Sequence, residues 1–329
     1  MRRLAPMTLL LALLLGAFAL AACGEDDEST GGESTEQPSS TDGGGSQIQR
    51  DEANAKIKLK IGSKNFTEQK VLGEIYAQGL RAAGYDISTD LNLGDEQTAL
   101  KAVKGGDIDA YPEYTGTALL SFFGKKADEL PKDPEAAYEE AKKGFEGEGL
   151  TAFPPTPFTS SNEVAVTQDT ADKLGLENIS DLEGQSEKLT LFGSPECRQR
   201  LDCLLGLQQV YGLKFKKFVP VDLEQRHDVL TSGRADVSIV FTTDPQIQRE
   251  KEVLLEDDKG MFPPYNSTLV MKQETADDVG PNFEKTLDMI QNQLTDENMQ
   301  ELNARVDLDK KDAATVAKEY LTETGLISA

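Results

Sequence analysis

The chain has 329 residues and a formal net charge of −24, from 58 acidic and 34 basic residues. An acidic surface of this kind excludes nucleic acid as a partner, because binding to phosphates needs a basic footprint, and it favours a soluble monomer. Residues 1–22 carry +2 and residues 23–54 carry −8, so residues 55–329 carry −18. That last stretch is longer than one ordinary hydrophobic core requires, and two lobes are therefore expected.

Residues 1–22 predict a secretory signal peptide of the lipoprotein type. Arg2 and Arg3 precede an apolar run from Leu9 to Leu20, which is too short for a stable membrane span. The run ends in small residues directly before Cys23, and this pattern resembles the bacterial lipobox, whose cysteine is lipidated. We expect Cys23 to anchor the protein on the extracytoplasmic face of the cell membrane. A plain signal peptide followed by an incidental cysteine is the alternative.

Residues 23–54 have the composition of a flexible tether. They are rich in Gly, Ser, Thr, Gln, Asp and Glu and contain almost no large apolar side chain. Such a segment cannot bury enough surface to offset the entropy of folding, and its excess of acids keeps it extended. We expect a disordered spacer between the lipid anchor and the folded part.

Apolar periodicity from residue 57 onward predicts alternating strands and helices. Ile57, Leu59 and Ile61 alternate as in a strand, and Thr67 is expected to cap a helix that Gly84 ends. Further strands are expected near 87–93, 108–110, 163–167, 188–192, 215–221, 237–241 and 268–271. From about residue 281 the pattern is helical, and this tail is expected to pack on the first lobe. The alternation predicts an α/β fold with mostly parallel sheets.

Two segments 127 residues apart have the same pattern. Residues 106–115 and 233–242 both read Gly-x-x-Asp, four residues, an aromatic residue and Thr. Upstream of each, residues 60–63 and 191–194 end an apolar run on Gly-Ser. This doubling predicts two similar lobes that face each other across a cleft, with the ligand near the carboxyl ends of the strands. A chance match of ordinary helix-to-strand punctuation is the alternative.

Once Cys23 is lipidated, two cysteines remain. Cys197 and Cys203 form an even pair in an oxidising compartment, which favours a disulfide around a short loop that contains Arg198 and Arg200. The competing interpretation is a metal site. Two thiols and the chain's single histidine, His227, provide too few ligands for zinc, so no metal is expected. His227 lies in a polar run and is expected to be exposed and without a role.

Four motifs together resemble the bacterial osmoprotectant-binding proteins, the solute receptors of ABC importers for glycine betaine, carnitine and choline. They are residues 62–69 (GSKNFTEQ), 111–117 (YPEYTGT), 195–200 (PECRQR) and 262–265 (FPPY). The resemblance covers essentially all of residues 56–329. It implies a type II periplasmic-binding-protein fold in which lobe 1 comprises residues 55–158 and 263–329. Lobe 2, residues 159–262, is then inserted between two hinge crossings and closes over the solute.

The resemblance also implies a box of aromatic rings for the cationic head of the solute. Tyr114 and Tyr265 correspond to box members, Phe241 occupies the place of a third tyrosine, and Asn162 stands where many relatives have a fourth. A quaternary ammonium group cannot donate a hydrogen bond, so ring faces are the natural means of recognising it. The box is incomplete at Asn162. Tyr111 is either recruited to the box or packed in the core between the lobes.

Three further residues match the family's carboxylate-binding positions. They are Lys64, Thr117 and Arg200. An arginine fork and a lysine point charge together favour an anionic oxygen group. The alternatives are that Lys64 is a solvated loop residue and that Arg200 forms a surface ion pair of little effect.

The sequence therefore predicts a receptor for a small zwitterionic or quaternary-ammonium solute, with no cofactor, that works with ABC permease and ATPase subunits. A bulkier solute and a solute-sensing lipoprotein are the alternatives. An enzyme is disfavoured, because the chain lacks Gly-x-Ser-x-Gly, His-Glu-x-x-His, a Walker loop and a dinucleotide-binding glycine pattern.

Overall fold

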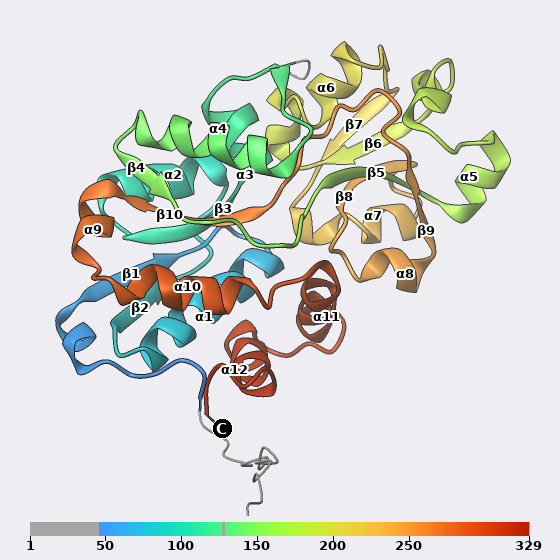
Figure 1. Ribbon diagram of the computed structural model, residues 1–329. Coiled ribbons are helices and arrows are strands. Elements are labelled where there is room, and N and C mark those ends of the chain that lie inside the picture. Colours follow the sequence, from blue (N-terminus) through green and yellow to red (C-terminus); the bar gives the residue numbers. More distant parts are fainter. Residues whose placement is uncertain (1–45, 127–128, 329) are drawn as a thin grey trace, which may run out of the picture. The chain divides into compact units, whose positions relative to one another are not determined.

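The computed structural model describes residues 46–126 and 129–328. The predicted signal peptide, Cys23 and most of the predicted tether lie outside the described residues. Within the described part, ten strands form two five-stranded sheets (Figure 1). The first sheet consists of β1 (Lys58–Gly62), β2 (Asp86–Asp90), β3 (Ala110–Tyr114), β4 (Leu150–Ala152) and β10 (Ser267–Lys272). The second consists of β5 (Asn162–Thr167), β6 (Thr190–Gly193), β7 (Lys217–Pro220), β8 (Val237–Phe241) and β9 (Glu252–Leu255).

The two sheets have the same topology. The first has the order β2-β1-β3-β10-β4 and the second the order β7-β6-β8-β5-β9. In each, three parallel strands are followed by a strand that runs antiparallel to both its neighbours, β10 in the first sheet and β5 in the second. The two halves of the folded chain are therefore two similar α/β lobes, which confirms the prediction made from the repeated sequence pattern. The expectation of mostly parallel sheets was wrong for these positions, because β5 and β10 enter their sheets from the opposite lobe.

Helices flank both sheets. In the lobe of the first sheet, lobe 1, they are α1 (Thr67–Ala82), α2 (Glu96–Gly105), α3 (Thr115–Thr117), α4 (Pro134–Glu146), α9 (Gln273–Asp278), α10 (Asn282–Gln291), α11 (Asp296–Asp307) and α12 (Ala313–Glu323). In lobe 2 they are α5 (Gln168–Leu174), α6 (Leu204–Gln209), α7 (Asp228–Thr231) and α8 (Gln246–Glu250). None of the helices in the described ranges is both long and apolar enough to cross a membrane.

The chain crosses between the lobes twice, at residues 153–161 and 256–266. The two crossing segments pair with each other through an antiparallel bridge between Thr159 and Asn266. Beside the bridge, the amide of Ser160 donates to the carbonyl of Tyr265 at 3.1 Å, and the amide of Tyr265 donates to the Thr159 hydroxyl at 3.1 Å. This pairing has the arrangement of a two-stranded hinge. The lobe boundaries at 158/159 and 262/263 stay a prediction.

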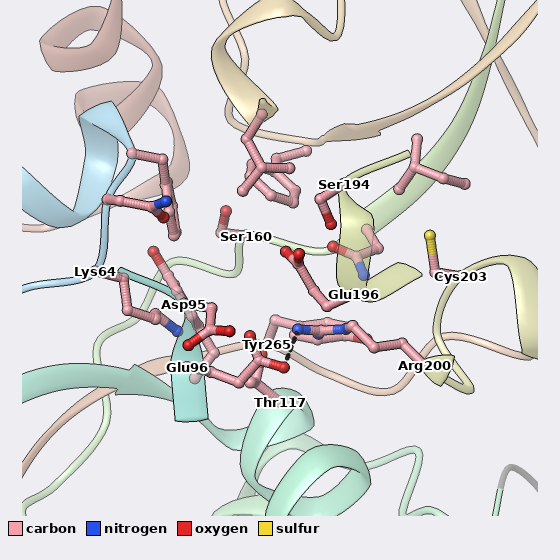
Figure 2. A pocket seen from close by; sticks show the side chains of 17 residues that line it. Lys64, Asp95, Glu96, Thr117, Ser160, Ser194, Glu196, Arg200, Cys203 and Tyr265 are labelled. Atoms are coloured by element: carbon pink, nitrogen blue, oxygen red, sulfur yellow. Dashed lines mark ion pairs between the residues drawn. The ribbon is translucent and has the colours of Figure 1, made fainter. Parts of the chain in front are cut away.

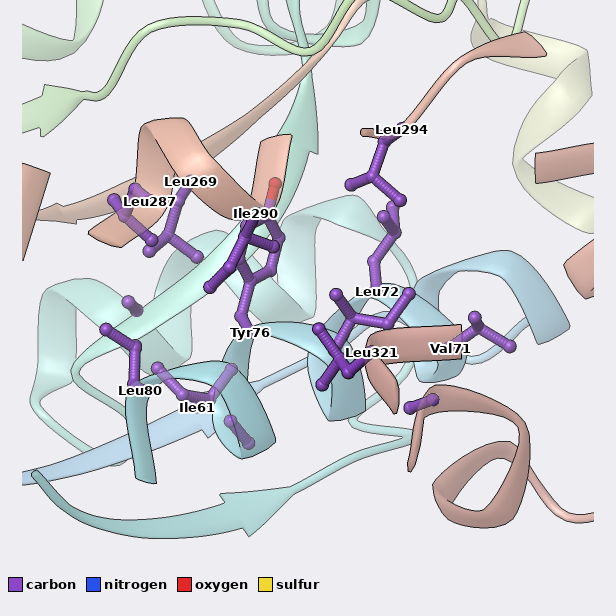
Figure 3. Close-up of a cluster of buried hydrophobic side chains, with 14 of the residues drawn as sticks. Ile61, Val71, Leu72, Tyr76, Leu80, Leu269, Leu287, Ile290, Leu294 and Leu321 are labelled. Atoms are coloured by element: carbon purple, nitrogen blue, oxygen red, sulfur yellow. The ribbon is translucent and has the colours of Figure 1, made fainter. Parts of the chain in front are cut away.

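The C-terminal helices pack on lobe 1, as expected. Figure 3 shows Val71, Leu72 and Tyr76 of α1 together with Ile290 of α10 and Leu321 of α12 in one buried cluster. All five side chains are fully buried, which places a large apolar area out of water. The helix α11 also reaches lobe 2, where Asn303 and Gln300 donate to the carbonyls of Thr243 and Thr242 at 3.2 and 3.1 Å.

Three local expectations were wrong. Thr67 does not cap α1, because Phe66 is the N-cap residue and the Thr67 hydroxyl donates instead to Asp307 at 2.6 Å. The strands β4 and β9 were not predicted, since three or four residues at a sheet edge leave too little periodicity to detect. The predicted tether was extended too far toward residue 54. From residue 46 the chain is folded, with Ile48 buried and its amide bonded to the carbonyl of Leu326 at 3.0 Å.

Candidate cleft site between the lobes

A cavity of ≈ 60 Å³ lies where the carboxyl ends of the parallel strands of both lobes converge (Figure 2). Residues just after β1 and β6 and at the ends of β3 and β8 contribute to its wall. This is the position at which open α/β sheets hold ligands. Seven of the eight residues predicted to bind the ligand line the cavity, namely Lys64, Tyr114, Thr117, Asn162, Arg200, Phe241 and Tyr265.

The eighth residue, Tyr111, does not line the cavity. Its side chain is fully buried in a hydrophobic cluster that α2 and α4 form with the first sheet. The same cluster contains Leu119 and Phe145. Successive residues of a strand point to opposite faces, so Tyr111 and Tyr114, three positions apart on β3, cannot both face the cleft. Recruitment to the aromatic box was therefore wrong, and Tyr111 packs in the core of lobe 1 and not in a core between the lobes.

An aromatic residue that the sequence argument did not assign, Phe66, completes a group of rings. Its ring centroid lies 6.3 Å from that of Tyr114 and 5.4 Å from that of Phe241. Tyr265 from the hinge also lines the cavity. The rings of Phe66 and Tyr114 come from lobe 1 and that of Phe241 from lobe 2, so the group forms only when the lobes approach each other. Phe66 lies inside the motif 62–69, and its place in that motif was the available signal.

Tyr114 is fixed by a buried carboxylate. Its hydroxyl donates to Oε1 of Glu68 at 2.6 Å, and the amide of Asn303 donates to Oε2 of Glu68 at 3.0 Å. Burial raises the pKa of Glu68, while hydrogen bonds from Thr243, Tyr114 and Asn303 oppose that rise. Because these contacts join α1, β3 and α11, the ring of Tyr114 has a defined orientation in the wall of the cleft.

Lys64 is buried and paired. Its ammonium group forms an ion pair with Glu113, and its Nζ lies 4.6 Å from the ring centre of Tyr114. Oε1 of Glu113 also accepts from the amide of Tyr114 at 2.8 Å. Burial raises the pKa of Glu113, and the charge of Lys64 opposes that rise. The interpretation of Lys64 as a solvated loop residue was therefore wrong, because its side chain is only 5% exposed.

Arg200 is held by two carboxylates from different lobes. Its Nε and Nη2 donate to Asp202 at 2.8 and 2.6 Å, and its Nη1 lies 2.9 Å from Oε1 of Glu96 at the start of α2 (Figure 2). Burial would raise the pKa of Asp202, but the charge of Arg200 and the hydrogen bonds from Arg200 and Tyr265 hold it below its usual range. The interpretation of Arg200 as a surface ion pair was wrong. Glu96 was not anticipated, because sequence spacing does not reveal contacts across a cleft. Asp202 lies only two residues from Arg200 on the same loop, and the sequence argument overlooked this local partner.

The loop that contains Arg200 is closed by the predicted disulfide between Cys197 and Cys203. Both cysteines are buried in the lobe 2 core, and Cys203 also lines the cavity. Asp202 and Arg200 thus belong to a loop whose ends are covalently joined, which limits the conformations that their side chains can adopt.

His227 is not exposed. It is 4% exposed, with Nδ1 2.8 Å from Oε2 of Glu252 and Nε2 3.0 Å from Oδ2 of Asp244. Asp244 also binds Arg226 and accepts from the amide of Phe241 at 2.8 Å, and the guanidinium of Arg226 lies 4.7 Å from the ring centre of Phe241. The expectation of an exposed histidine was wrong, because the polar run around it folds inward to meet two buried carboxylates. Asp244 and Arg226 therefore hold Phe241 in place, Asp244 through its backbone amide and Arg226 through its ring.

No three His, Cys, Asp or Glu side chains in residues 46–126 and 129–328 come together in a group that could hold a metal ion. The chemistry that the described cavity offers is therefore that of aromatic faces, two paired cations and several carboxylates, all suited to binding a small polar solute.

The fold and the cleft define a two-lobed solute-binding protein. Residues 57–323 match the family described as the substrate binding domain of the ABC-type glycine betaine transport system, and the chain belongs to that family. The match spans both lobes and confirms the resemblance that the four motifs indicate.

Related proteins support this assignment along most of the chain. The chain is 34% identical to the glycine-betaine-binding protein of Pseudomonas aeruginosa over 82% of its own length and 88% of that protein. It is 30% identical to the carnitine transport binding protein OpuCC of Listeria monocytogenes, over 81% and 87% of the two chains. A crystal structure titled as a glycine betaine/carnitine/choline ABC transporter superposes with a TM-score of 0.64 at 27% identity, covering 81% of this chain and 99% of that one.

Proposed function

We propose that the protein is the extracytoplasmic receptor of an ABC importer and that it closes its lobes over a small solute with a quaternary ammonium head. The observation that carries the proposal is the set of four aromatic residues, Phe66, Tyr114, Phe241 and Tyr265, that line one cavity between the lobes. An ammonium ion without N–H donors gains little from hydrogen-bond acceptors and about 2 kcal/mol from a desolvated ring face. Its family membership and the relatives that bind glycine betaine and carnitine support the same solute class.

The proposal assigns roles to the seven cavity residues of the sequence prediction. Tyr114, Phe241 and Tyr265, joined by Phe66, hold the cationic head. Asn162 does not supply a ring. Its amide instead donates to Oδ2 of Asp202 at 3.0 Å, and so steadies the wall that carries Arg200. Lys64, Thr117 and Arg200 line the part of the cavity that receives the remainder of the solute.

The role is one of binding and delivery without catalysis. The receptor is proposed to act as a monomer that Cys23 anchors to the membrane by lipid, and to pass its solute to permease and ATPase subunits. No feature of the cavity favours a second function over this one.

Isothermal titration calorimetry of the purified protein tests the proposal against glycine betaine, carnitine, choline and an uncharged sugar. We expect saturable binding of at least one quaternary ammonium solute and none of the sugar. Binding should also raise the midpoint of thermal unfolding, because a ligand that binds only the folded state stabilises it, by about 2.7 kcal/mol at a hundredfold excess over Kd. Absence of binding by all three ammonium solutes would contradict the proposal.

A further inference from the structure

A buried carboxylate lies at the hydroxyl of Tyr114, one of the rings that line the cavity. Glu68, in the first turn of α1, is only 3% exposed. It forms no ion pair with any residue in the described ranges 46–126 and 129–328. Asp and Glu side chains are almost never buried to this extent unless a cation pairs with them, so the position of Glu68 calls for an explanation.

Two buried cations lie over rings of the site, but other carboxylates neutralise them. Lys64 is paired with Glu113, and Arg226 is paired with Asp244. Glu68 also raises the pKa of Arg226, but by less than Asp244 does. Neither cation is therefore a dedicated counter-ion for Glu68.

Glu68 is instead surrounded by neutral hydrogen-bond donors. The Tyr114 hydroxyl donates to Oε1 at 2.6 Å, and the Asn303 amide donates to Oε2 at 3.0 Å. The hydroxyls of Thr243 and Ser160 also hydrogen-bond to the carboxylate. Donors on both oxygens favour the ionised form, and neutral donors leave its negative charge uncancelled.

The route from this charge to the solute passes through Tyr114, because Tyr114 lines the cavity and Glu68 does not. A hydrogen bond from a phenol to a carboxylate is charge-assisted, and it polarises the phenol, so that the ring face becomes more negative. A more negative face attracts a cation more strongly. Nζ of Lys64 lies 4.6 Å from the centre of this ring, which shows that positive charge is accommodated there.

We propose that Glu68 is a positioning residue for the cationic head of the solute, on which it acts through Tyr114 by fixing the ring and making its face more negative. The inference rests on the proposed function and deepens it, because it identifies the group that tunes one ring of the site. The head of the solute then supplies the positive charge that the described chain does not supply to Glu68. The cost of burying an unpaired carboxylate is partly recovered when the solute binds, and the affinity for a cation rises accordingly.

A purely structural role for Glu68 makes a different prediction. Asn303, which donates to Glu68, also donates to the carbonyl of Thr243 in lobe 2 at 3.2 Å. If Glu68 only braces this contact between α11 and lobe 2, its loss weakens the binding of every solute to the same degree. If Glu68 acts through its charge, its loss weakens the binding of a cation more than that of a neutral solute of the same shape.

Choline and 3,3-dimethylbutanol separate the two roles, because they have the same shape and differ in the charge of the head. Calorimetric titration of the purified protein measures the Kd of each. Glu68→Gln, which removes the charge and retains an oxygen for the Tyr114 hydroxyl, should raise the Kd of choline by about tenfold and that of the neutral analogue by less than about threefold. Glu139→Gln makes the same change of charge at an exposed position of α4, and it should leave both Kd values within about twofold.

A double-mutant cycle with Tyr114→Phe tests the route. Tyr114→Phe keeps the ring and removes the hydroxyl through which Glu68 acts. In that background Glu68→Gln should therefore cost less than about twofold in choline affinity. Tyr114→Phe alone should reproduce the selective loss of choline, so it tests the inference even where Glu68→Gln fails to fold.

Equal losses of choline and 3,3-dimethylbutanol in Glu68→Gln would overturn the inference in favour of a structural role. An undiminished effect of Glu68→Gln in the Tyr114→Phe background would also overturn it, since the charge would then act on the solute directly. The same holds for Tyr114→Phe that binds choline as tightly as wild type does. In each of these cases the binding of choline by wild type leaves the proposed function standing. If no quaternary ammonium solute binds wild type, the proposed function itself fails.

Discussion

The hydroxyl of Tyr265 donates a hydrogen bond to Oδ2 of Asp202 at 2.7 Å. Tyr265 belongs to the crossing segment before β10, and Asp202 belongs to the disulfide loop of lobe 2, so this bond joins the hinge to the loop that carries Arg200. The same oxygen accepts from Asn162 at 3.0 Å and from Arg200 at 2.6 Å. One completely buried carboxylate therefore positions a ring, an amide and a cation of the cavity.

Replacing Asp202 should accordingly destabilise the protein. In Asp202→Ala the guanidinium of Arg200 loses its main partner while it remains largely buried, and we expect the free energy of unfolding to fall by about 3 kcal/mol. Urea denaturation monitored by circular dichroism measures the change. Asp169→Asn, at an exposed acid of the same lobe, serves as the control and should change it by less than about 0.5 kcal/mol. A loss under about 1 kcal/mol in Asp202→Ala would contradict the role assigned to this carboxylate.

Gly116 allows the ring of Tyr265 to approach lobe 1. A Cβ at this position would lie 2.8 Å from Cδ1 of Tyr265 and 2.8 Å from Cγ of Pro263, closer than such atoms can pack. Gly116→Ala should therefore displace the Tyr265 ring, at a cost of about 1–3 kcal/mol in the free energy of unfolding, and weaken solute binding. Gly105→Ala is the steric control, because Gly105 has helical backbone in α2 and a Cβ there meets only the Asp107 side chain, at 3.5 Å, an ordinary contact distance. Unchanged solute affinity in Gly116→Ala would show that the ring tolerates the shift.

The periodic and repeated features of the sequence were the ones that predicted structure. The predicted strand 237–241 coincides with β8. The repeated segments 106–115 and 233–242 contain the equivalent strands β3 and β8, and each of these strands ends at the cleft. Local periodicity and turn residues determine these elements, so a single sequence reveals them. The edge strands β4 and β9 and the antiparallel insertion of β5 and β10 depend on contacts between distant segments, and they were missed for that reason.

The candidate site likewise has residues that the sequence predicted and residues that it did not. Lys64, Tyr114 and Tyr265 lie in motifs of unusual residue order, and the structure places all three on the cavity. The partners of these residues were not assigned to them, because Glu113 lies 49 positions from Lys64 and Asp202 lies 63 positions from Tyr265, and contacts over such separations leave no local pattern. His227 shows the opposite error: its polar surroundings suggested exposure, whereas those polar groups are its buried partners.

The stability contribution of His227 should depend on pH. Burial lowers the pKa of His227, but the hydrogen bonds to Asp244 and Glu252 outweigh it and raise the pKa above its ordinary value of 6.5. The folded state therefore favours the protonated ring, and the resulting stability is complete below pH 6.5 and is lost as the pH rises through the folded pKa. The difference in free energy of unfolding between wild type and His227→Gln should be largest at pH 6 and smaller at pH 9. A difference that grows toward pH 9 would contradict this assignment.

Glu163 on β5 provides a second pH-dependent contribution. Burial and the charge of Asp257 raise the pKa of Glu163 from 4.5 to about 7. The folded state holds the proton more tightly than the unfolded state, so stability is lost between about pH 4.5 and pH 7 as the carboxyl ionises. Glu163→Gln removes this loss and should raise the free energy of unfolding by about 2 kcal/mol at pH 8, with little effect at pH 4. An equal effect at both pH values in urea titrations would show that hydrogen bonding, not ionisation, is responsible.

Phe66 tests whether the ring group recognises charge. Its ring lies between those of Tyr114 and Phe241, 6.3 and 5.4 Å away, and the side chain is 7% exposed. Leucine keeps an apolar wall but removes the π face, so Phe66→Leu should weaken binding of choline by about tenfold, the equivalent of about 1.4 kcal/mol and within the range of one desolvated cation–π contact.

The neutral analogue 3,3-dimethylbutanol, in which carbon replaces the ammonium nitrogen of choline, isolates the charge. It should bind wild type more weakly than choline does, and Phe66→Leu should reduce its affinity much less, because no cation–π contact is lost. Phe66→Tyr retains a π face and should keep most of the affinity for choline, provided that the added hydroxyl finds a partner. Calorimetry of both ligands with each variant gives the comparison. Equal losses for choline and its neutral analogue in Phe66→Leu would mean that the ring supplies only apolar surface, and the cationic head would then have to be recognised by the carboxylates of the cavity.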